Sequence, residues 1–142
     1  MPYRNRRQTK PYKKYIKTLG PGQCQFCEIT SESEQFVEQT ASFEVVRNIF
    51  PYTMWDEQGV SDHLLLLPKK HTDTLSDLTP EEAQEFVKLM SRYENKGYNV
   101  YARAPGSHIK SVYHQHTHLI KSDHRRLKTL FYFGRSHIRF MR

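Results

Sequence analysis

The chain has 142 residues, a formal net charge of +7 and a mean hydropathy of −0.80. This length favours a single domain with a modest core. The longest aliphatic run, residues 64–67, is far too short to span a bilayer, and no apolar stretch follows the basic N-terminus. The composition therefore predicts a cytoplasmic protein without a secretory signal or a membrane span.

Positive charge is concentrated at the two ends of the chain. Residues 1–17 carry seven Lys and Arg side chains and no acidic one, and residues 121–142 carry seven against Asp123 alone. The middle, residues 18–120, has eight cations and fourteen acids, a net charge of −6. Such basic ends either bind nucleic acid or another polyanion, or simply remain solvated.

The first 19 residues are predicted to form a basic arm. Tyr3, Tyr12 and Tyr15 lie between its cations, which favours base stacking or packing onto the domain. A turn at residues 20–22, Gly-Pro-Gly, then leads to two cysteines.

Cys24 and Cys27 have the C-x-x-C spacing, which favours metal or redox chemistry over a structural disulfide. A redox pair usually lies in a βαβ context, and none is predicted here. Zinc prefers four thiolate or imidazole ligands, and spacing alone does not identify the other two.

Short strands follow the cysteines. Residues 36–39 and 43–47 are predicted to pair as a hairpin, and residues 63–67 to form a buried strand that ends at Pro68. Residues 48–62 between them are predicted to be a loop. Three large aromatic residues occur in this loop: Phe50, Tyr52 and Trp55.

A single long helix is predicted to begin at Thr79. Thr79 is a good N-cap, Pro80 suits the first helical position, and Glu82 completes a capping box. Apolar residues then recur at helical spacing, and Gly97 is a typical stop. These apolar residues are Ala83, Phe86, Val87 and Met90.

Further strands are predicted at residues 98–103 and 114–121, and residues 127–133 are predicted to be either another strand or a helical turn. Hairpin strands with one amphipathic helix indicate an α+β domain in which the helix covers one face of the sheet.

Three histidines, His114, His116 and His118, alternate within the last of these strands. Successive side chains of a strand point to opposite faces, so all three imidazoles are expected on one face. Imidazole serves as a nucleophile, a general acid or base and a metal ligand near neutral pH. The alternative is a solvated, histidine-rich strand.

These motifs together resemble the histidine-triad (HIT) family, whose signature is H-x-H-x-H followed by two apolar residues. Ser111-Val-Tyr before the triad resembles the family's Ser-Val-aromatic sequence. The stretch from His63 to His71 resembles its histidine, apolar strand and Pro-Lys-x-His. Cys24 and Cys27 resemble the C-x-x-C of the zinc-containing branch. The resemblance covers roughly residues 24–121.

The resemblance implies an antiparallel sheet of about five strands with one long helix packed on it. It divides the chain into the arm at 1–19, a catalytic domain at 20–121 and a basic C-terminal extension at 122–142. Many members form a two-fold dimer, so a homodimer is expected. The polar residues Gln115 and Thr117, where the family usually has apolar ones, leave open what covers the other face of the triad strand.

The resemblance also supplies a metal site. It implies that zinc is held by the two cysteines, His71 and His114, with no open coordination position and hence a structural role.

For catalysis, the resemblance implies that His116 attacks the α-phosphorus of a nucleotide and forms a nucleotidyl-histidine. His118 and His63 would surround the phosphate, and Ser111 would donate to a phosphate oxygen or assist the leaving group. Lys110, where the family commonly has Gln, would offer positive charge to the developing anion.

Residues for the nucleoside are implied in the same way. Asn48 would bind ribose hydroxyls, and Phe50 and Trp55 are candidates for base stacking. Arg103 stands where Hint-like members have Asn, and with Lys110 it indicates either a more anionic substrate or two ordinary exposed cations. Residues 53–62 are predicted to be an insertion at the mouth of the site.

The function expected is a nucleotidyl hydrolase or transferase that acts on nucleoside phosphoramidates or dinucleoside polyphosphates. Two alternatives remain: the same chemistry at nucleic-acid ends, with the basic termini as contacts, or a non-catalytic zinc-stabilised nucleotide-binding domain. In either enzyme the arms are expected to be auxiliary, so that deletion of residues 1–17 leaves kcat on a small nucleotide nearly unchanged.

Overall fold

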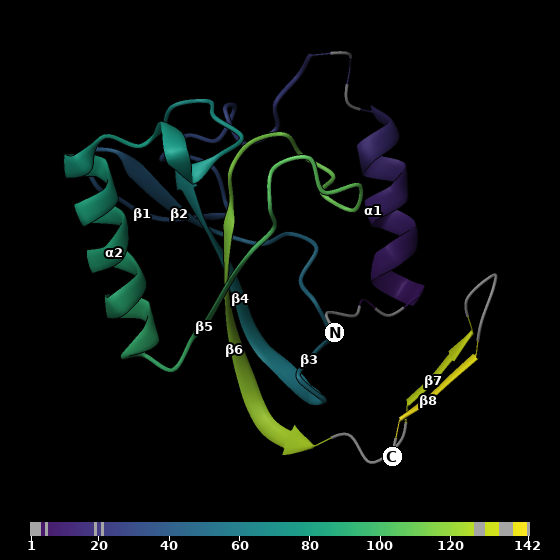
Figure 1. Ribbon diagram of the computed structural model, residues 1–142. Helices are drawn as coiled ribbons and strands as arrows, with labels where there is room; N and C mark the ends of the chain where they lie inside the picture. The colour runs from purple at the N-terminus through teal and green to yellow at the C-terminus, as the bar shows by residue number, and fades with distance from the viewer. Residues whose placement is uncertain are drawn as a thin grey trace.

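The centre of the molecule is a six-stranded antiparallel sheet (Figure 1), seen in a computed structural model that describes residues 4, 6–18, 20, 22–126, 130–133 and 138–141. The strand order is β1-β2-β4-β6-β5, and β3 pairs with β4 beside this path. The strands are β1 (Phe36–Gln39), β2 (Phe43–Arg47), β3 (Met54–Trp55), β4 (Gln58–Pro68), β5 (Asn99–Ala102) and β6 (Thr117–Arg126). The predicted α+β class, with an antiparallel sheet and a long helix, is confirmed.

The predicted hairpin β1–β2 has the expected bounds, but the loop predicted at residues 48–62 is half strand. β3 pairs with the start of β4 through a tight turn, so that β4 begins at Gln58 rather than at His63. Asp56 and Glu57 make this turn with φ values of 47° and 61°, the left-handed conformation that two-residue hairpin turns require. The predicted insertion is therefore largely a hairpin.

The long helix α2 (Pro80–Glu94) covers one face of the sheet (Figure 1). Both hydrogen bonds of the predicted capping box form between Thr79 and Glu82, and Gly97 follows the helix with a φ of 84°. The main core lies between α2 and the sheet. Its buried members are Phe43, Val45, Leu64, Leu66, Phe86, Leu89, Tyr93 and Leu119.

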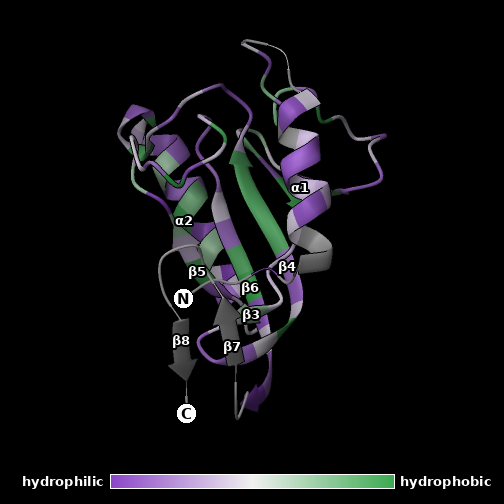
Figure 2. Ribbon diagram, turned by 90° about the vertical axis from the view of Figure 1, so that its right-hand side faces the viewer, coloured by the Kyte–Doolittle hydropathy of each residue, from purple (hydrophilic) through white to green (hydrophobic). Residues whose placement is uncertain are grey.

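The opposite face of the sheet has a smaller apolar cluster, made by Ile29, Val46, Leu65 and Leu67. Residues 64–67 of β4 are thus buried on both faces, which explains their unbroken apolar run. Figure 2 shows this apolar colour along β4 and β6, between the two helices.

A helix that the sequence did not predict, α1 (Arg6–Thr18), lies on this second side of the sheet, across from α2 (Figures 1 and 2). Tyr12 and Tyr15 are half-buried toward the domain. Four lysines on its outer face are exposed: Lys10, Lys13, Lys14 and Lys17. The arm therefore includes an amphipathic helix that packs on the domain.

The remaining elements are the 3-10 helix η1 (Leu75–Asp77) and a hairpin of β7 (Leu130–Phe133) and β8 (Ile138–Met141). The strand alternative predicted near residues 127–133 is thus seen at β7, and residues 127–129 lie outside the described residues. Within the described ranges, none of the helices has the length and apolar character needed to cross a membrane.

Candidate functional site

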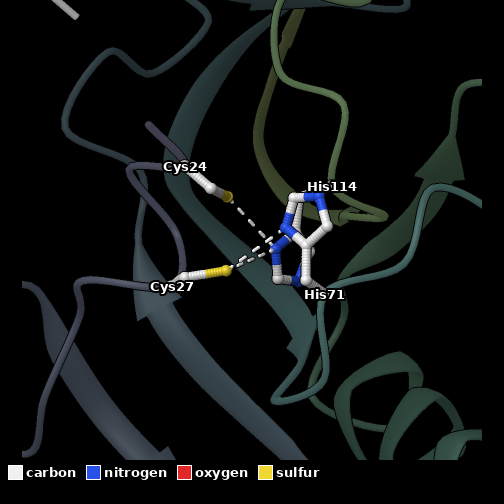
Figure 3. A group of neighbouring side chains, drawn as sticks. All are labelled: Cys24, Cys27, His71 and His114. Carbon is white, nitrogen blue, oxygen red and sulfur yellow. Dashed lines mark hydrogen bonds between the residues drawn. The ribbon is translucent and has the colours of Figure 1, made fainter. Parts of the chain in front are cut away.

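Two cysteines and two histidines form a cluster that suits a metal ion (Figure 3). One ligand atom from each of Cys24, Cys27, His71 and His114 lies within 4.8 Å of all the others. Cys24 Sγ is 3.3 Å from His114 Nδ1, and Cys27 Sγ is 3.3 Å from His71 Nδ1. Bonds of about 2.3 Å to sulfur and 2.0 Å to nitrogen place tetrahedral ligand atoms roughly 3.5 Å apart, so this geometry fits zinc.

A second contact prepares His114 for this role. Its Nε2–H donates to the Pro68 carbonyl at 2.8 Å, which leaves the Nδ1 lone pair directed at the cysteines. Burial and the neighbouring Cys24 raise the pKa of Cys27 to about 11. A bound divalent cation would instead lower the pKa of Cys27, because cysteine binds zinc as the deprotonated thiolate.

The sequence predicts all three triad histidines in one strand, but only His118 lies in a strand. β6 begins only at Thr117, so His114 and His116 lie in the segment that precedes it. Gln115 N–H donates to the Thr72 carbonyl at 2.6 Å, which ties this segment to the chain after β4 instead of to a strand partner. As a result, His114 turns to the cysteines while His116 and His118 line a common cavity.

His63 and His118 are joined across β4 and β6. Tyr52 N–H donates to His63 Nδ1 at 3.0 Å, so the proton of the neutral His63 ring lies on Nε2. That Nε2 is 2.9 Å from His118 Nδ1, and it donates there. Asn48 Nδ2 lies 3.2 Å from the same Nε2, but both atoms carry hydrogen in this tautomer, so this contact is not a hydrogen bond. The chain of contacts therefore fixes the tautomers of both rings.

His116 has the opposite tautomer. Its Nδ1 is 2.7 Å from the carbonyl oxygen of His114, so Nδ1–H donates and Nε2 keeps a free lone pair. Burial lowers the pKa of His116 to about 4, which keeps the ring neutral at neutral pH. A neutral imidazole with an unprotonated Nε2 is the form in which histidine acts as a nucleophile.

Several predicted residues meet at the cavity in front of His116. It has a volume of ≈50 Å³ and is lined by Asn48, Phe50, Ser111, His116 and His118 among others. Asn48 Oδ1 accepts from Phe50 N–H at 2.9 Å, which orients the amide. The structure thus brings the candidate nucleophile together with Asn48, Phe50, Ser111 and His118, one or two of the residues expected for each part of a nucleotide.

Four predicted residues do not line this cavity: His63, which contacts it through His118, and Lys110, Trp55 and Arg103. Lys110 has a side chain only 1% exposed, and its Nζ forms an ion pair with Asp73 and donates to the Asp73 carbonyl at 3.0 Å. The Asp73 carboxylate therefore compensates the charge of Lys110, as a buried ammonium requires. Trp55 packs between Tyr52 and Tyr101, outside the cavity, and Arg103 lies over the Tyr101 ring at 5.4 Å.

Sequence reasoning gave no site role to several residues that line this cavity, among them Arg4, Tyr12, Tyr15, Phe26 and Arg47. Phe26 packs its ring edge against His116 at 5.2 Å between centroids, so the segment between the cysteines also shapes the catalytic side. For Arg4, Tyr12 and Tyr15, the only local signal in the sequence was the presence of tyrosines among the N-terminal cations.

Acid should weaken the fold through His63. Burial first, then the charges of Arg4 and His116, lowers the pKa of His63 to about 3, against an ordinary value of 6.5. The unfolded chain takes up this proton as the pH falls below about 6.5, whereas the folded one does not until about 3. The free energy of unfolding should therefore fall across this window, by up to about 1.4 kcal/mol per pH unit for one such proton.

Urea denaturation at pH 7, 5.5 and 4.5 would measure this slope. His63→Gln removes the titrating group, and its slope should be smaller than that of the wild-type protein. Equal slopes in the two proteins would show that His63 is not the group responsible.

The comparisons with known proteins agree with this geometry. A family model described as the HIT domain matches residues 30–125. The comparison with curated proteins finds no match.

Solved structures share the fold at low identity. A hypothetical protein from Leishmania major is 22% identical, with a TM-score of 0.57 over 83% of this chain and 87% of that one. A HIT family hydrolase from Clostridium thermocellum is 19% identical, with a TM-score of 0.55 over 78% and 100%. A Zn-bound histidine triad family protein from Mycobacterium smegmatis is 22% identical, with a TM-score of 0.54 over 74% and 78%.

Proposed function

Because the chain belongs to the histidine-triad (HIT) domain family, we propose that it is a nucleotidyl hydrolase or transferase in which His116 is the nucleophile. The observation that supports this most directly is the tautomer of His116. Its Nδ1–H is held by the His114 carbonyl, and its bare Nε2 belongs to a ring that lines the cavity with Ser111 and Asn48. One of the similar solved structures is itself described as a HIT family hydrolase.

The reaction would proceed in two displacements at phosphorus. The Nε2 lone pair of His116 attacks the α-phosphorus of a nucleotide, the bond to the leaving group breaks, and the leaving group takes up a proton from solvent. Water then attacks the phosphorus of the nucleotidyl-histidine, the phosphorus–nitrogen bond breaks, and the neutral imidazole and the nucleoside monophosphate are restored as the water proton returns to solvent. A neutral nucleophile suits this step, because anionic phosphate oxygens repel anionic nucleophiles. Covalent catalysis also divides one difficult reaction into two easier ones.

The neighbouring groups have matching roles in this proposal. His118 donates from its Nε2, since its Nδ1 already accepts from His63, and would hold a phosphate oxygen. The Ser111 hydroxyl would donate to another oxygen or to the leaving group. Asn48 and Phe50 would contact the nucleoside. The substrates that we infer are nucleoside phosphoramidates or dinucleoside polyphosphates.

Zinc would be the structural ion of this enzyme. Cys24, Cys27, His71 and His114 provide the four ligands, so the site keeps no open position for catalysis. His114 would then be fixed two residues before His116, and its carbonyl would hold the nucleophile in the reactive tautomer.

The test is to detect the covalent intermediate. The wild-type protein mixed with adenosine 5′-phosphoramidate or diadenosine tetraphosphate should gain the mass of one adenylyl group after rapid quenching in denaturant at alkaline pH, where the phosphorus–nitrogen bond to histidine survives. Peptide mapping should place this group on His116, and adenosine monophosphate should accumulate in solution. Turnover without any adduct, or an adduct on another residue, would contradict the proposed mechanism.

A further inference from the structure

The N-terminal segment forms a wall of the histidine cavity. Tyr12 Oη donates to Ser111 Oγ, which connects α1 directly to a residue of the candidate site. The rings of Tyr12 and Tyr15 pack on Phe50, with centroid distances of 5.3 Å and 5.4 Å. Both tyrosines line the same cavity as His116.

Arg4 is the charged residue of this wall. Its Nε donates to the Phe50 carbonyl at 2.7 Å, and its guanidinium lies between the rings of Tyr12 and Tyr52, at 4.6 Å and 4.7 Å from their centroids. The Tyr52 ring in turn contacts His63, at 4.7 Å between centroids. Two aromatic faces and one hydrogen bond thus hold the guanidinium beside the histidines.

The charge of Arg4 is not compensated within the described part of the chain, where no acidic side chain forms an ion pair with it. Burial is the main cause that lowers its pKa, and repulsion from Arg103 adds to it. Burying a cation without a counter-ion costs free energy of desolvation. A bound anionic ligand would offset this cost by pairing with the guanidinium.

Two cations line the cavity, and Arg4 is the half-buried one, whereas the side chain of Arg47 is exposed. Lys110 is neutralised by Asp73, and burial keeps His63 and His118 uncharged at neutral pH. A phosphate group that entered this space would meet no positive charge from them. Arginine suits a phosphate especially well, because its planar fork donates two parallel hydrogen bonds.

We propose that Arg4 binds a phosphate group of the substrate, so that the N-terminal segment supplies a binding residue of the site. The nucleoside part of the substrate rests on the proposed function, whereas the role of Arg4 requires only an anionic phosphate. This reverses the sequence-based expectation that the arm is auxiliary, because one residue of the arm, Arg4, would belong to the substrate-binding machinery.

The experiment compares three ligands on two variants. Arg4→Gln removes the guanidinium, and Lys13→Gln is the matched control, because it removes an exposed cation from the same segment. Calorimetric titration would measure the affinities for adenosine monophosphate, adenosine and inorganic pyrophosphate. Thermal unfolding would be followed in parallel, and both variants should unfold at the wild-type temperature.

Arg4→Gln should weaken adenosine monophosphate and pyrophosphate binding by about 10- to 100-fold, since hydrogen bonds to charged groups contribute about 1.5–3 kcal/mol. Adenosine affinity should change less than two-fold, and Lys13→Gln should match the wild type. If Arg4→Gln loosens the fold, Arg4→Lys keeps the cation and should retain more affinity for the monophosphate.

Three results would overturn the proposal: equal losses for adenosine and its monophosphate, which indicate a purely structural wall; unchanged monophosphate affinity in Arg4→Gln; or no binding of any ligand by the wild type. A selective phosphate loss without a His116 adduct in the wild type would instead retain the role of Arg4 and reject the proposed chemistry.

Discussion

Replacing His116 with alanine should abolish formation of the adenylyl adduct and reduce kcat on a nucleoside phosphoramidate by roughly 10⁴-fold or more, as for other covalent nucleophiles. Binding of adenosine monophosphate should stay within a few-fold, because the ring contributes one edge of a cavity that Asn48, Phe50 and Ser111 also line. Intact-mass measurement would detect the adduct, and stopped-flow kinetics would measure turnover.

The matched control is His108→Ala, which removes an exposed histidine from the loop before the triad and should leave kcat unchanged. His118→Ala and Ser111→Ala should slow turnover by smaller factors, about 10²–10⁴, since they position and donate rather than form the bond. Substantial hydrolysis by His116→Ala would mean that another group, such as an activated water, is the nucleophile.

Removal of zinc should have the largest effect on stability. We expect about one equivalent of zinc per chain, and a loss of several kcal/mol after chelation or in Cys24→Ser, because the binding free energy of a structural metal is folding free energy. At about 3 °C per kcal/mol, the thermal midpoint should fall by roughly 10 °C or more. Elemental analysis and calorimetry would measure the two quantities.

Chelator added to Cys24→Ser provides the internal control, since it should cause little further change once the site is already broken. A metal-free wild-type protein with full stability and activity would reject the zinc assignment. It would also reopen the interpretation of Cys24 and Cys27 as a redox pair.

Local signals made the regular elements predictable. The capping box at Thr79 and the stop at Gly97 defined α2, and the short apolar runs defined β1 and β2. The β3–β4 hairpin was missed because Asp56 and Glu57 form its turn without a glycine, the residue that usually marks left-handed positions.

The metal cluster was also easier to predict from the sequence than the wall of the histidine cavity. The four metal ligands followed from the resemblance to the histidine-triad family, since spacing alone did not identify the two histidines, and the structure brings them together. The wall at Arg4 depends on contacts between residues far apart in the chain: 46 positions separate Arg4 from Phe50, and 99 separate Tyr12 from Ser111. Likewise, nothing near Lys110 in the sequence indicates that Asp73 neutralises it.

Amide hydrogen exchange should divide the site into a slow and a fast part. β4 is hydrogen-bonded to β2 on one side and to β6 on the other, so its amides are expected to exchange only when the whole domain opens. α1 contacts the loops that contain Phe50 and Ser111 through a few side chains, and its amides should exchange much sooner. The cavity, at ≈50 Å³, is well under the roughly 300 Å³ of small-ligand sites, so we expect α1 to open locally when a whole nucleotide binds. The substrate would then enter through the least stable part of the molecule, while the histidines of β4 and β6 remain on the most stable part.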